Sequence, residues 1–105
     1  MRKIKEEEFK KTIESGKFVV DFYADWCGPC KMLAPNLQEL EEELNGAGVE
    51  ILKINVDEAP ALSEEMGIQF IPYVVTFVDG VKKDAFSGYK SVEELRTFIK
   101  NSMAI

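Results

Sequence analysis

The sequence has no histidine, only two cysteines among its 105 residues, and a single tryptophan. The missing histidine excludes Ser-His and Cys-His catalysis, and it removes a ligand that most zinc centres use. Two cysteines are too few for the disulfide-rich scaffold of a small secreted domain. These two residues, Cys27 and Cys30, stand only three positions apart, which makes them the first candidates for a functional site.

The sequence also has no long apolar run, and its positive charges do not outnumber its negative ones. No segment approaches the ~20 apolar residues needed to cross a bilayer, and no apolar stretch of a secretory signal follows the basic residues at the start. We therefore expect a cytoplasmic protein without membrane contact. Lys and Arg total 13 against 19 Asp and Glu, a net charge of −6, which argues against nucleic acid as a partner.

The composition and length are those of a folded domain. Hydrophobic residues make up 46% of the chain and charged residues 30%, which is the balance of a globular protein rather than a disordered one. We expect residues 1–105 to form one domain, and its size and charge favour a monomer.

Hydrophobic periodicity predicts strands that alternate with helices. Strands are expected over residues 17–24, 49–56, 73–78 and 81–86, the last two joined by a tight turn at Asp79-Gly80. Helices are expected over residues 6–13, from the cysteines to about residue 44 with a kink at Pro35, from a cap at Asp57 through residue 66, and after the capping box that begins at Ser91. This order predicts an α/β layered domain with a mostly parallel sheet centre and an antiparallel edge.

The two cysteines lie where a buried strand ends and a helix begins. Cys27 falls at or just before the helix start and Cys30 one turn further, close enough to form a disulfide. Because a helix N-terminus favours negative charge, the pKa of the Cys27 thiol should be lowered. Gly28 lets the loop turn, and Pro29 gives up an N–H group that would be unbonded there. Position alone predicts that Cys27 is the exposed sulfur.

This geometry predicts thiol–disulfide exchange. Cys27 as a thiolate attacks a substrate disulfide, and Cys30 then attacks Cys27 and releases the reduced substrate. Three other interpretations remain open. A zinc site would have too few ligands, a purely structural disulfide would close a loop too short to stabilise much, and a pair of inert core cysteines would not explain the Gly-Pro between them.

The run VDFYADWCGPCKM, residues 20–32, resembles the active-site signature of the thioredoxin family. The resemblance covers nearly the whole chain and includes Gly67-Ile68, Ile71-Pro72 and Asp79-Gly80. It implies a thioredoxin fold, with a central mixed β-sheet of four to five strands flanked by four helices. It also implies a protein-disulfide reductase that uses no metal and no cofactor besides its Cys27–Cys30 disulfide. The expected partners are a thioredoxin reductase and disulfide-containing proteins.

The resemblance also assigns two charged residues to the site. It implies that Asp21 is a buried carboxylate that assists proton transfer for Cys30, and that Lys53 faces it from a neighbouring strand. Burial would raise the pKa of Asp21 towards the range useful for proton transfer. From the residues alone, Asp21 could equally lie on a solvated strand face, and Lys53 could be an ordinary surface lysine.

A substrate-docking surface follows from the resemblance as well. Pro72 matches the family's cis-proline, and the Ile71 backbone is expected to pair with an extended substrate segment. The alternative for Trp26 is an ordinary half-buried aromatic. The full surface is expected to comprise Trp26, Gly28, Pro29, Ile71, Pro72 and Gly88.

Three positions depart from the family pattern, namely Tyr23, Phe70 and Tyr73, and they leave the substrate range open. The dipeptide Gly28-Pro29 supplies no histidine between the cysteines, so it favours a reductant over an oxidant or isomerase. A further role as a binding module, independent of redox state, stays compatible with the sequence.

Overall fold

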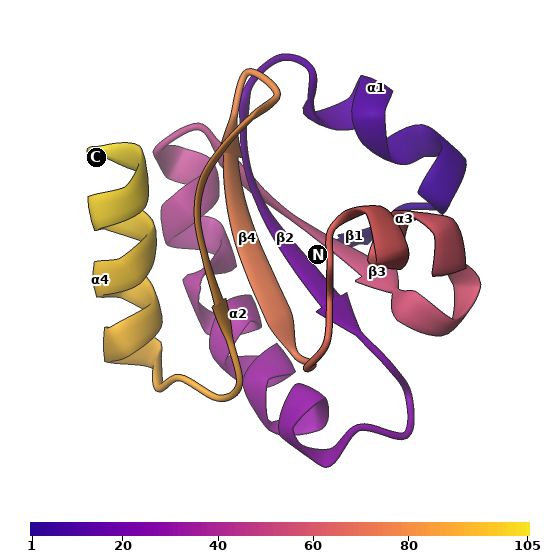
Figure 1. Ribbon diagram of the computed structural model, residues 1–105. Coiled ribbons are helices and arrows are strands. Elements are labelled where there is room, and N and C mark those ends of the chain that lie inside the picture. Colours follow the sequence, from indigo (N-terminus) through magenta and orange to yellow (C-terminus); the bar gives the residue numbers. More distant parts are fainter.

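The computed structural model describes all residues 1–105 and contains one five-stranded sheet in the order β1-β3-β2-β4-β5 (Figure 1). Strands β1, β3 and β2 are parallel neighbours, whereas β4 pairs antiparallel with both β2 and β5. The expected mixed sheet is therefore confirmed. The strands are Arg2–Lys3 (β1), Lys17–Tyr23 (β2), Val49–Asn55 (β3), Tyr73–Val78 (β4) and Val81–Ser87 (β5).

Four α-helices cover the two faces of the sheet, as predicted. Figure 1 shows α1 and α3 on one face and α2 and α4 on the other. None of the helices has the length and apolar composition that crossing a membrane requires. The helices are Phe9–Ile13 (α1), Gly28–Gly46 (α2), Pro60–Glu65 (α3) and Val92–Met103 (α4), with short 3-10 turns at Glu6–Glu8 (η1) and Val56–Glu58 (η2).

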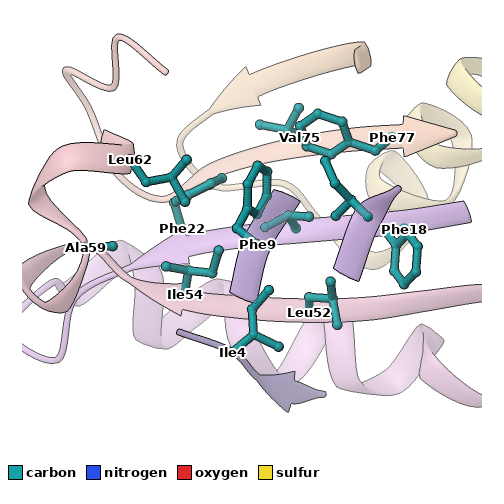
Figure 2. Packing of buried hydrophobic residues seen from close by; sticks show 12 residues of the cluster. Ile4, Phe9, Phe18, Phe22, Leu52, Ile54, Ala59, Leu62, Val75 and Phe77 are labelled. Atoms are coloured by element: carbon teal, nitrogen blue, oxygen red, sulfur yellow. The ribbon is translucent and has the colours of Figure 1, made fainter. Parts of the chain in front are cut away.

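Successive side chains of β2 point to opposite faces of the sheet, so the strand serves two cores. Val20 and Phe22 join the cluster under α1 and α3 (Figure 2), where the Phe9 ring packs edge-on against Phe77 at 5.5 Å between centroids. Val19 points to the other face and joins the cluster that α2 and α4 cover. All four leucines of the predicted α2 stripe are buried in this second cluster: Leu33, Leu37, Leu40 and Leu44.

Two predicted helices differ from the structure at their first turns. The predicted helix over residues 6–13 begins as the 3-10 turn η1 and becomes α-helical only at Phe9; tight 3-10 turns are common at helix N-termini. Asp57 does not cap the third helix, because it lies within η2. The helix α3 begins at Pro60 after Ala59, and its Leu62 N–H is bonded instead by Glu6 Oε2 at 2.7 Å.

The other turn and cap signals are confirmed. Asp79 and Gly80 both have positive φ angles, 48° and 81°, as the two central residues of a type I′ hairpin turn require. At α4, Ser91 Oγ accepts from Glu94 N–H at 3.2 Å while Ser91 N–H donates to Glu94 Oε1 at 2.9 Å. Helix α2 continues through Pro35, and the kink expected there stays a prediction.

Candidate active site

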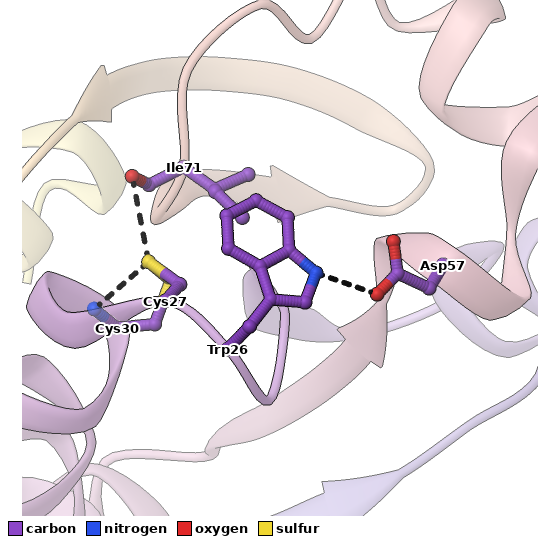
Figure 3. Close-up of a disulfide and its surroundings, with 5 residues drawn as sticks. All are labelled: Trp26, Cys27, Cys30, Asp57 and Ile71. Carbon is purple, nitrogen blue, oxygen red and sulfur yellow. Dashed lines mark hydrogen bonds between the residues drawn. A yellow bond between two sulfur atoms is a disulfide. The ribbon is translucent and has the colours of Figure 1, made fainter.

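The two cysteines lie at the first turn of α2 and form a disulfide, with 5.2 Å between their Cα atoms. Cys27 is the N-cap residue, in extended conformation, and the N–H of Cys30 donates to Cys27 Sγ at 3.2 Å (Figure 3). Pro29 occupies the first turn, where its missing N–H costs no hydrogen bond. The predicted position of the pair at the strand-to-helix junction is confirmed.

The expected difference in exposure between the two sulfur-bearing residues is wrong. Cys27 is 4% exposed and Cys30 3%, so both are covered almost equally. Position on the helix did not account for the neighbouring loop, which packs Ile71 against the cysteines and places its carbonyl oxygen 3.8 Å from Cys27 Sγ. The loop at Ile71 therefore contributes to the burial of the region around Cys27.

Trp26 stands beside this region and is held in place although it is 69% exposed. Its indole N–H donates to Asp57 Oδ2 at 2.8 Å (Figure 3), so the interpretation as a half-buried aromatic is wrong. Asp57 was missed as a site residue. The signal that identifies it is tertiary, because β2 and β3 are parallel neighbours and the residues that follow them meet at one edge of the sheet.

The loop before β4 and the turn after β5 complete the surface. The Ile71-Pro72 peptide bond is cis, which confirms the expectation for Pro72. Pro72 itself is buried, and its carbonyl oxygen accepts from Gly88 N–H at 2.8 Å. Gly88 has a φ of 95°, a conformation that side chains rarely adopt. Gly28 and Pro29 are exposed on the other side of the cysteines.

Asp21 lies in the interior behind the disulfide and is only 2% exposed, so the interpretation as a solvated residue is wrong. It is the register partner of Lys53 across β2 and β3, as the resemblance implied. Burial raises the pKa of Asp21 from 3.8 to about 7, and the charge of Lys53 partly opposes this. Asp21 Oδ1 has no hydrogen-bond partner.

A cavity of about 170 Å³ connects this carboxylate with Cys30 and the surface. Asp21, Cys30 and Lys53 all line it, so a proton donor or acceptor and the inner sulfur share one small space. Lys53 is partly buried rather than fully exposed, and its ammonium lies 5.5 Å from the centre of the Tyr23 ring. No group of three or more His, Cys, Asp or Glu residues is arranged to hold a metal ion.

Two of the departures from the family pattern, Phe70 and Tyr73, flank the Ile71-Pro72 segment that is expected to dock substrate. Phe70 precedes Ile71 and is 71% exposed, which is unusual for so large an apolar side chain. Tyr73 is partly buried, and its hydroxyl accepts from Lys82 Nζ at 3.3 Å. The residues that precede Cys27 and Ile71 in the chain, Trp26 and Phe70, are therefore both exposed aromatic side chains.

Comparisons with known proteins agree with this geometry. The family model described as Thioredoxin matches residues 1–101. A thioredoxin of Rickettsia felis is 39% identical over 102 residues, covering 95% of this chain and 96% of the relative, and one of Chlamydia caviae is 43% identical over 89 residues, covering 85% of each. The crystal structure of chloroplastic thioredoxin z superposes with a TM-score of 0.85 at 33% identity, covering all of this chain and 96% of that one.

Proposed function

This chain belongs to the thioredoxin family and is a thiol–disulfide oxidoreductase, and from that premise we propose that it reduces protein disulfides in the cytoplasm and that a thioredoxin reductase reduces its own disulfide again. Members of this family work in general with a reductase and with disulfide-containing substrates. The observation on which the proposal depends is the Cys27–Cys30 disulfide at the helix N-terminus.

Cys27 is the nucleophile of the proposed cycle. In the reduced protein the Cys30 N–H and the positive end of α2 favour the Cys27 thiolate over the thiol. The thiolate attacks one sulfur of the substrate disulfide, a Cys27–substrate bond forms, and the other substrate sulfur leaves as a thiolate that takes a proton from solvent.

Cys30 resolves the mixed disulfide. Its thiol gives a proton to the ionised carboxylate of Asp21, and the resulting thiolate attacks Cys27 Sγ. The Cys27–Cys30 bond forms, the Cys27–substrate bond breaks, and the substrate sulfur leaves as a thiolate that takes a proton from solvent. Two electrons have then passed from the dithiol to the substrate disulfide. A pKa of about 7 for Asp21 supports this role, because both its ionised and protonated forms are then populated near neutral pH.

Substrate segments dock on the surface around the cysteines. We assign this surface to Trp26, Gly28, Pro29, Ile71, Pro72 and Gly88. The position of the Ile71 carbonyl oxygen beside Cys27 Sγ supports pairing between the Ile71 backbone and an extended chain that brings its disulfide to the sulfur. We also expect the protein to act as a monomer, since a single chain supplies every residue of the site.

Insulin reduction in the presence of dithiothreitol tests the exchange reaction, and NADPH with a thioredoxin reductase tests the electron source. Cys30→Ser should trap substrates as mixed disulfides on Cys27, and its matched partner Cys27→Ser should trap none. No insulin reduction by the wild-type protein would contradict the proposal, and so would equal trapping by the two variants. A reduction potential close to that of periplasmic oxidants would contradict the assignment as a reductant.

A further inference from the structure

The ammonium group of Lys53 has no role in the proposed exchange cycle, although Lys53 lines the cavity that reaches Cys30. Lys53 Nζ lies 5.5 Å from the centre of the Tyr23 ring, within the range of an attractive cation–π interaction. This is the one interaction that the structure records for the Lys53 ammonium, which forms no hydrogen bond and no ion pair with a carboxylate.

Asp21 would be the natural partner of this ammonium. Residues 21 and 23 alternate onto the same face of β2, and Lys53 is the register partner of Asp21 on β3. All three side chains line the cavity that reaches Cys30. Nevertheless Asp21 forms no ion pair, and its Oδ1 has no hydrogen-bond partner.

We propose that Tyr23 is a positioning residue that holds the Lys53 ammonium over its ring and so keeps it from a direct ion pair with Asp21. The ring and the carboxylate compete for one cation. Lys53 therefore acts on Asp21 from a distance, and burial remains the stronger influence on the carboxyl group. The inference rests on the proposed function, in which Asp21 exchanges a proton with Cys30.

A direct ion pair would change the chemistry of the site. An ammonium within ion-pair distance favours the ionised carboxylate and lowers its pKa. Asp21 would then be mostly ionised near neutral pH and would be a weaker base towards the Cys30 thiol. The aromatic ring avoids this because it attracts the cation without carrying a charge of its own.

Other charged groups surround the same space and have to be kept constant in any test. Tyr23 is also close enough to Lys3 on β1 and Glu58 on η2 for their charges to act on its hydroxyl group. The groups that face the cavity or Tyr23 from neighbouring elements are the terminal residue Met1, Lys3 on β1, Asp25 after β2, Lys31 on α2 and Glu58 on η2.

The test is the titration of the Asp21 side-chain carboxyl carbon, followed by NMR in the oxidised protein. Tyr23→Leu should move the midpoint down by about one pH unit, because the released ammonium approaches the carboxylate. Tyr23→Phe keeps the ring and should retain the wild-type midpoint. Lys53→Met should raise the midpoint, and adding Tyr23→Leu to Lys53→Met should then cause no further change.

The outcomes separate this inference from the proposed function. An unchanged midpoint in Tyr23→Leu would overturn the inference, as would an equal shift in the presence and absence of Lys53, which would reveal a general packing effect. Insulin reduction by the wild-type protein is measured in parallel. Its absence would refute the proposed function whatever the titrations show, whereas normal reduction with unresponsive titrations would refute only the role of Tyr23.

Discussion

The burial of Asp21 predicts a pH-dependent cost in stability that Asp21→Asn should remove. In the folded protein the pKa of Asp21 is raised from 3.8 to about 7, a difference of about 3 pH units. At 1.36 kcal/mol per unit this corresponds to about 4 kcal/mol. The folded state binds this proton more tightly than the unfolded state, so the contribution of Asp21 to stability is most favourable below pH 4 and is lost as the pH rises to 7.

Asparagine has nearly the same shape but no charge to desolvate. Oxidised Asp21→Asn should match the wild-type protein near pH 4 and exceed its free energy of unfolding by up to about 4 kcal/mol at pH 8. Urea unfolding at several pH values measures this difference by linear extrapolation. Glu42→Gln, which removes one negative charge from an exposed position on α2, is the matched control and should show no comparable change with pH.

The pH dependence of the stability difference between Asp21→Asn and the wild-type protein tests this explanation. A stability difference between Asp21→Asn and the wild-type protein that is flat from pH 4 to 8 would refute the reasoning, because it would mean that Asp21 titrates alike in the folded and unfolded states. A difference that grows as the pH falls would contradict its sign.

Three further variants test other contacts. Asp57→Ala removes the acceptor of the Trp26 indole N–H, so the fluorescence anisotropy of the single tryptophan should fall, and unchanged anisotropy would show that the bond does not hold the ring. Phe70→Ala should raise KM for apolar peptide disulfides with kcat little changed and with stability within about 0.5 kcal/mol of wild type, whereas Val81→Ala, another exposed apolar residue, should leave both constants unchanged. Ser91→Ala should lower the free energy of unfolding by about 1 kcal/mol through loss of the α4 cap, measured in urea, and an unaltered value would indicate that the capping hydrogen bonds contribute nothing net.

Local patterns in the sequence were sufficient for most of the fold. The leucine spacing of α2 and the Asp79-Gly80 turn each express one simple periodicity or backbone preference, and both are confirmed. The first and third helices were predicted less well at their starts, because a cap depends on which side chain reaches the free N–H groups. Glu6, which lies 56 positions away along the chain, bonds the Leu62 N–H, and no local pattern reveals such a partner.

Some features of the site could likewise be predicted from the local sequence, and others depend on tertiary contacts. The positions of Cys27 and Cys30 follow from a strand-to-helix junction that can be read locally. Their nearly equal burial does not, because it depends on the loop at Ile71, 44 positions away along the chain. The hydrogen bond from Trp26 to Asp57 requires knowledge that β2 and β3 are adjacent and parallel, a tertiary fact that only the fold establishes.

The cost of burying Asp21 and its usefulness have one physical cause, so they should change together. Desolvation destabilises the ionised carboxylate, and the same desolvation raises the pKa into the range where a proton can be exchanged with Cys30. In variants that retain Asp21 but change its surroundings, such as those at Tyr23 and Lys53, the free energy of unfolding at pH 8 should therefore change linearly with the titration midpoint of Asp21. Each downward shift of one pH unit in the titration midpoint should recover about 1.4 kcal/mol of stability at pH 8. Variants that recover stability without moving the midpoint would show that packing, and not ionisation, limits the stability of this part of the sheet.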